Sequence, residues 1–224
     1  MANIIVDITL GALVIALNPL VIILVILLVL SKRSRTNSTL FLLGWFITIL
    51  LIGWLVLFLA EAGHISAGAE RTTTMSILKL LFGILFLILA AYYWKKRPAP
   101  GQPAEVPPWM DSIDNFTGRK SLTTGIVIAG ANPKNIGITI AASLEIALAA
   151  LPSPQSWVAM GIFTLMCSLA ILAIIVYSRI AGKSAEKTLN SWKAWLVVHN
   201  ATVLMVVLLI LGGKWVVDAL SSLI

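Results

Sequence analysis

The sequence predicts an all-α integral membrane protein with six transmembrane helices. Of its 224 residues, 59% are hydrophobic and only 11% are charged, and the mean hydropathy is +1.01. A soluble domain is about half apolar and about a quarter charged. The apolar residues also form long runs, and the basic residues gather between alternate runs. This composition excludes an ordinary soluble globule, a disordered chain and a basic nucleic-acid-binding domain.

Each apolar run is long enough to cross a bilayer, which needs about 20 apolar residues. The runs are uninterrupted, whereas strands of a membrane barrel alternate between apolar and polar residues. Helices are therefore expected. The six predicted spans cover residues 4–30, 38–60, 75–94, 120–150, 156–178 and 194–217.

Basic residues mark one side of the predicted membrane protein. Twelve of the 16 Lys and Arg residues lie in the first, third and fifth loops. Cytoplasmic loops carry an excess of Lys and Arg. We therefore expect these loops in the cytoplasm, both termini outside, and a multi-pass protein of the cytoplasmic (inner) membrane. The twelve are Lys32, Arg33, Arg35, Lys95, Lys96, Arg97, Arg119, Lys120, Arg179, Lys183, Lys187 and Lys193.

An internal repeat divides the chain near its middle. Four positions recur at an offset of 114 residues: Gly11, Asn18, Pro19 and Ile22 align with Gly125, Asn132, Pro133 and Ile136. Each half holds three spans, so the halves must enter the membrane in opposite directions, as in many secondary transporters. We expect two inverted three-helix repeats within one integral membrane domain. The first, residues 1–112, includes the cytoplasmic loop, and the second covers residues 113–224.

The two Asn-Pro pairs predict broken helices in the first and fourth spans. Proline removes a backbone donor and disrupts the preceding turn, but it is well accommodated at the first position of a helix. Asn is a good N-cap. Free backbone groups at this depth require a protein interior or a wet cavity. Asn18-Pro19 and Asn132-Pro133 would each present a positive helix end, and two such ends suit an anion.

Lys134 and Asn135 follow the second pair directly. A lysine near the bilayer centre is costly and is usually functional, so both are assigned with the Asn-Pro pairs to substrate binding. The first repeat has Leu20 and Val21 at the matching positions. A structural ion pair or a snorkelling side chain is the alternative for Lys134, and an ordinary kink for packing is the alternative for each proline.

Three titratable residues are candidates for proton coupling: Glu145, Asp7 and His199. Glu145 and Asp7 fall towards the predicted outer side, where an interfacial position is the simpler explanation. His199 lies in the last span, where a histidine more often bonds between helices. Lys79, one turn into the third span, is expected to snorkel outwards.

The third loop contains a predicted amphipathic segment. Trp109, Met110, Ile113 and Phe116 recur at helical spacing, with acidic residues on the other side. Such a segment is typical of a helix on the membrane surface. Trp109 and Phe116 are its candidate anchors to the membrane or to a partner, and a plain linker is the alternative.

Residues 107–143 resemble the most recognisable segment of the GAP/Sap-like family, the glycopeptidolipid- and sulfolipid-addressing proteins of mycobacteria and relatives. A Pro-x-Trp-Met element, an Asp-x-Phe-Thr element and Asn132-Pro133-Lys134-Asn135 carry the resemblance. The family is grouped with the lysine-exporter superfamily of six-span transporters. The resemblance implies movement of a lipid or glycolipid across the cytoplasmic membrane, towards the cell envelope. Leu20 and Val21 depart from superfamily members that have further prolines or glycines there.

The sequence therefore predicts a transporter, or flippase, for an anionic lipid or lipid-linked glycan, working by alternating access. Two alternatives stay open: a small-solute, amino-acid or ion exporter, and a non-transporting membrane partner of a lipid-export complex. Predicted partners are the lipid or glycolipid substrate, a second copy of the chain, and lipid-synthesis or lipid-export machinery, with no nucleic acid. No catalytic, metal or cofactor motif is evident, so neither an enzyme nor a cofactor is expected.

Overall fold

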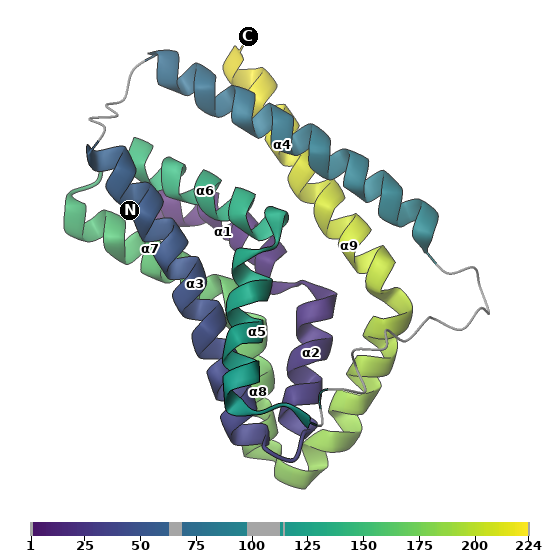
Figure 1. Ribbon diagram of the computed structural model, residues 1–224. Coiled ribbons are helices and arrows are strands. Elements are labelled where there is room, and N and C mark those ends of the chain that lie inside the picture. Colours follow the sequence, from purple (N-terminus) through teal and green to yellow (C-terminus); the bar gives the residue numbers. More distant parts are fainter. Residues whose placement is uncertain (1, 63–68, 98–112, 114, 224) are drawn as a thin grey trace.

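The computed structural model describes residues 2–62, 69–97, 113 and 115–223 (Figure 1). These residues are helical, and no strand occurs among them. The helices are α1 (Ala2–Ala16), α2 (Pro19–Leu30), α3 (Ser34–Ala62), α4 (Ala69–Lys96), α5 (Gly118–Gly130), α6 (Pro133–Leu148), α7 (Ser153–Cys167), α8 (Leu169–Ala181), the 3-10 helix η2 (Gly182–Ser184) and α9 (Ala185–Leu223). The all-α prediction is confirmed for this part of the chain.

Several of these helices are long and apolar enough to cross a membrane. By length and composition, α3, α4 and α9 qualify on their own. The pairs α1–α2 and α7–α8 qualify as bent spans, with bends of 52° and 56°, which gives up to five spans among the described residues. The pair α5–α6 carries Arg119, Lys120, Lys134 and Glu145 and is not among them. The chain is thus a multi-pass membrane protein, whereas six spans and an inverted repeat stay predictions.

The break between α7 and α8 was not predicted. No proline or glycine stands at Cys167 or Ser168. Instead, the Ser168 hydroxyl donates to the Thr164 carbonyl at 2.9 Å, and the Thr164 hydroxyl donates to the Met160 carbonyl at 2.9 Å. Hydroxyls that bond back to the preceding turn often bend helices. Two hydroxyl residues four apart were the available sequence signal.

Close backbone contact joins α3 to α5. A methyl group added to Gly125 would lie 2.3 Å from the Phe41 carbonyl oxygen, and one added to Gly44 would lie 2.3 Å from the Leu122 carbonyl oxygen. Small residues allow membrane helices to approach this closely. α3 also packs on α6, so a helix of the first half of the chain rests on two helices of the second.

The helices α4 and α9 form a second close pair and run side by side (Figure 1). A methyl group on Gly212 would lie 2.9 Å from the Gly83 carbonyl oxygen. Trp215 of α9 packs against Phe86 of α4 with ring centroids 5.3 Å apart. This pair also joins the two halves of the chain.

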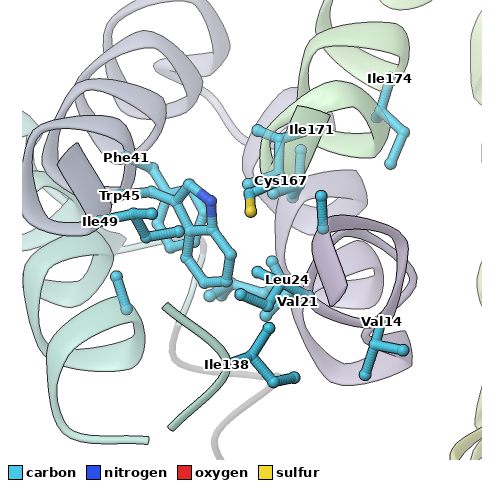
Figure 2. Close-up of a cluster of buried hydrophobic side chains, with 14 of the residues drawn as sticks. Val14, Val21, Leu24, Phe41, Trp45, Ile49, Ile138, Cys167, Ile171 and Ile174 are labelled. Carbon is cyan, nitrogen blue, oxygen red and sulfur yellow. The ribbon is translucent and has the colours of Figure 1, made fainter. Parts of the chain in front are cut away.

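The core lies where the broken helices meet α3. Figure 2 shows Cys167 near Trp45, with Val21 and Leu24 close to Ile138. All of these side chains are at most 3% exposed. α7 packs on α1, while α8 and α9 pack on α2. At the first break Asn18 and Pro19 are buried, whereas at the second break Asn132 is half-buried and Pro133 is exposed.

One end of the helix bundle is basic. It comprises the turn between α2 and α3, the start of α5 and the turn from α8 into α9, at the bottom of Figure 1. The chain reverses there at Gly182, whose φ of 54° lies in the left-handed region that glycine accommodates. The basic end carries Lys32, Arg33, Arg35, Arg119, Lys120 and Arg179.

Candidate functional site

The first helix break lies at Asn18-Pro19. α1 ends at Ala16 and α2 begins at Pro19. Asn18 has extended backbone angles (φ −72°, ψ 111°), and its side-chain oxygen accepts a hydrogen bond of 3.2 Å from the Leu20 amide. Asn18 is therefore an N-cap, and proline occupies the first helical position, as the sequence predicts.

The second break repeats this geometry at Asn132-Pro133. Asn132 has φ −85° and ψ 112°, and its side-chain oxygen accepts a hydrogen bond of 3.0 Å from the Lys134 amide. Each Asn thus takes up one of the amide N–H groups that the sequence analysis assigned to an anion. The positive dipole end of each half-helix remains.

Lys134 bridges the two breaks. Its Nζ donates a 2.9 Å hydrogen bond to the carbonyl oxygen of Val14, in the last turn of α1. In a continuous helix this carbonyl would accept from residue 18, but the break ends the helix before that bond can form. The ammonium group caps the negative end of α1, so in this conformation Lys134 holds α6 against α1.

Asn135 joins the two helices on either side of the second break, α5 and α6. It is 1% exposed, and its Nδ2 donates a 3.3 Å hydrogen bond to the carbonyl oxygen of Ile128. Its Oδ1 is buried and has no hydrogen-bond partner among the described residues. A buried acceptor without a partner is costly, which makes Asn135 a candidate to bind a donor group of a ligand.

An apolar cavity brings the two N-caps together. Its volume is about 360 Å³, and it lies between α2 and α5. Asn18 and Asn132 stand at one end, and most of the remaining wall is hydrocarbon. The lining residues are Asn18, Leu20, Val21, Leu24, Phe116, Thr124, Ile128 and Asn132. The predicted site residues Pro19, Pro133, Lys134 and Asn135 border the breaks but are not part of this lining.

Glu145 forms an ion pair that the sequence analysis missed. Its Oε1 lies 2.7 Å from the Nζ of Lys79, with side chains 17% and 22% exposed. The pair joins α6 to α4. Lys79 was expected to snorkel outwards on its own and instead neutralises Glu145. Their separation of 66 positions along the chain left no local signal for the pairing.

The other two candidates for proton coupling are not joined to the breaks by any described contact. His199 Nδ1 lies 2.8 Å from the carbonyl oxygen of Trp195, and the two rings stack with centroids 4.5 Å apart. The described polar and ring partners of His199 thus belong to its own helix, not to a neighbouring one. Asp7 belongs to α1, but its side chain lies outside the described part of the structure.

The segment before α5 is anchored to the protein at Phe116. Phe116 is 9% exposed and packs in the core with Ile113. The Asn37 side chain donates to the Phe116 carbonyl at 3.0 Å and to the Ser31 hydroxyl at 3.3 Å. Phe116 was expected at the membrane surface or against a partner, but its side chain is taken up by the protein and lines the cavity. Trp109 lies outside the described residues.

Comparison with known proteins gives a family assignment. Residues 8–221 match the family described as Sap, sulfolipid-1-addressing protein. No curated protein and no solved structure matches the chain significantly. The match covers both helix breaks, the cavity and most of α9.

Proposed function

The chain belongs to the Sap, sulfolipid-1-addressing protein, family, and from that premise we propose that it translocates an anionic lipid or lipid-linked glycan across the membrane. Family membership links this multi-pass membrane protein to sulfolipid addressing. The proposed step is alternating access of the polar head group to the two helix breaks, while the apolar chains stay in the bilayer or in the cavity.

One observation carries this proposal: Asn18 and Asn132, from opposite halves of the chain, line the same cavity. Interrupted helices are tolerated at membrane depth where they are buried or line a cavity, and in transporters they form the substrate site. The two half-helix ends provide positive charge at the cavity, which favours a sulfate or phosphate group, and Lys134 lies next to the second break, bonded to Val14 on its other side.

The cavity wall favours a lipid over a small polar solute. Apart from Asn18, Asn132 and Thr124, every lining residue is hydrocarbon or aromatic. The three polar residues lie at the breaks and at Thr124, and the hydrocarbon wall between them suits an alkyl chain. The alternative of a non-transporting partner rests on the 95–118 loop, and the burial of Phe116 removes one of its two anchors.

Proton coupling is not required by this proposal. Glu145 is paired with Lys79, and His199 bonds within its own helix. We place the basic end in the cytoplasm by the positive-inside rule, and the proposed transport is towards the cell surface.

A reconstituted assay tests the proposal. Vesicles of phosphatidylethanolamine and phosphatidylglycerol, with a trace of phosphatidylglycerol carrying a fluorophore on one chain, would report translocation by loss of fluorescence to an external quencher. We expect transport with the wild-type chain and at least a tenfold lower rate with Lys134→Met. Lys214→Met is the matched control, because Lys214 pairs with Asp218 near the end of α9, far from the breaks along the chain.

Two results would contradict the proposal. Equal rates in protein-free and protein-containing vesicles, for both this probe and a sulfated glycolipid probe, would exclude lipid translocation and favour the partner alternative. Undiminished transport by a folded Lys134→Met variant would show that the substrate site does not lie at the helix breaks.

A further inference from the structure

The structure is closed on one side of the helix breaks and open on the other. On the closed side, α1 packs against α6. Lys134 bonds to Val14 there, and a methyl group added to Gly11 would come within 2.9 Å of Ile138. On the open side, α2 and α5 do not pack against each other over their described residues, and the cavity lies between them.

The predicted repeat relates these two sides. Subtracting or adding the offset of 114 residues converts Lys134 and Val14 into Leu20 and Ile128. Leu20 of α2 and Ile128 of α5 both line the cavity. The closed contact of Lys134 with Val14 therefore has an open counterpart.

A second pair keeps the relationship on one wall of the cavity only. The same offset converts Ile138 and Gly11 into Leu24 and Gly125. Leu24 lines the cavity, whereas Gly125 packs on α3. The Leu20–Ile128 pair, both of whose members line the cavity, therefore marks the place where the repeat predicts a closed helix contact, and the cavity would narrow when that contact forms.

The cavity has the shape and chemistry of a site for an alkyl chain. Along α5 it extends from Asn132 to Thr124, eight residues or about 12 Å of helix. That is close to the depth of one leaflet in a hydrocarbon core of about 30 Å. Its volume of about 360 Å³ cannot hold a helix, whose diameter is about 10 Å. Its wall offers polar groups at the two breaks and at Thr124, and hydrocarbon elsewhere.

We propose that this cavity binds one acyl chain of the transported lipid, with the polar end of the lipid held at Asn18 and Asn132, and that closure of Leu20 on Ile128 expels the chain. This inference rests on the proposed function and adds which part of the lipid the cavity binds. Breaking the bond between Lys134 and Val14 would accompany closure, because the two contacts are alternatives under the repeat.

Photo-cross-linking tests the site. The full-length protein would be placed in vesicles of phosphatidylethanolamine and phosphatidylglycerol that contain a phosphatidylglycerol with a diazirine in one acyl chain. Illumination and peptide mass spectrometry would then locate the label. We expect labelling of residues 20–24 and 124–128 at least fivefold above the lipid-exposed face of α4 at Leu81, which is 60% exposed.

Filling the cavity gives the decisive comparison. Ile128→Trp should reduce labelling of both segments at least fivefold, because the indole occupies the chain's place. Val127→Trp is the matched control, since Val127 is the adjacent residue, is 59% exposed and does not line the cavity. If Ile128→Trp fails to fold, Leu20→Phe tests the opposite wall at a residue that is 39% exposed.

The outcomes separate this inference from the proposed function. Even labelling of all lipid-exposed faces, unchanged by Ile128→Trp or Leu20→Phe, would overturn the acyl-chain site even if the vesicles show translocation. If Ile128→Trp reduces labelling and Val127→Trp does not, in a protein without translocation activity, the acyl-chain site is supported. Only the transport proposal would then be overturned.

Discussion

The ammonium group of Lys134 is hydrogen-bonded to the carbonyl oxygen of Val14, 120 residues earlier in the chain and 2.9 Å away. This bond joins the start of α6 to the end of α1 and satisfies a carbonyl freed by the break at Asn18-Pro19. A lysine can cap a helix end in this way because the last carbonyls carry a partial negative charge.

Replacing Lys134 tests its contribution to stability separately from its role in transport. Lys134→Met keeps the hydrocarbon stem but leaves the Val14 carbonyl without its partner. We expect a loss of about 1–2 kcal/mol in unfolding free energy. Faster amide hydrogen exchange at Ala16 and Leu17 should accompany that loss. Unchanged exchange there in Lys134→Met would show that the bond does not support the break.

The ion pair between Lys79 and Glu145 should be energetically coupled. Both side chains are more than three-quarters buried, and removal of one partner leaves the other charge unpaired. Unfolding experiments on Lys79→Met, Glu145→Gln and the double variant should give a coupling energy of about 1–3 kcal/mol.

A proton-coupling role for Glu145 predicts a different pattern. Glu145→Gln would then abolish the pH dependence of transport, while Lys79→Met would shift it without abolishing it. We expect instead that both variants alter stability and leave any pH dependence of transport intact. Transport by each variant at several pH values distinguishes the two cases.

The close contact of α3 and α5 should not tolerate a side chain at Gly125. A methyl group there meets backbone atoms of α3, which cannot rotate away. We expect Gly125→Ala to cost about 1–3 kcal/mol, in the range of over-packed cores. Thermal unfolding in detergent would measure it. Gly161→Ala is the control, because a methyl group at Gly161 meets nothing within 4 Å; an equal loss in both variants would argue against the contact.

Asn37 should hold the segment before α5 in place. Asn37→Ala removes the bonds to Phe116 and Ser31, and loss of a buried hydrogen-bond partner costs about 1–3 kcal/mol. We expect faster proteolysis near residues 113–117 and weaker labelling of the cavity, because Phe116 forms part of its wall. Proteolysis rates matching the wild type would show that Phe116 is anchored by packing alone.

Local chemistry explains which features could be predicted from the sequence. Asn-Pro encodes both the end of one helix and the cap of the next, so the breaks at Asn18 and Asn132 were predictable to the residue. The break at Ser168 depends on hydroxyls that bond back to the preceding turn, and such hydroxyls bend some helices and not others. The pairing of Lys79 with Glu145 and the burial of Phe116 depend on tertiary packing. Neither can be predicted from a local sequence pattern.

The predicted repeat is an offset between residues, and an offset does not give the conformation. The offset says which residues correspond in the two halves. It does not say which of two corresponding contacts is formed. Only the structure shows that Lys134 meets Val14 while Leu20 and Ile128 stand apart.

The glycine contacts between α3 and α5 and between α4 and α9 bear on how this chain is made. Each contact joins an early helix to a late one, so neither half alone contains the close partners of α4, α5 and α9. A ribosome must release α9 before α4 gains the helix that lies along it. The helices α1 to α4 therefore enter the bilayer before these late partners exist. A chain cut after residue 112 should assemble only when both pieces are synthesised in the same membrane.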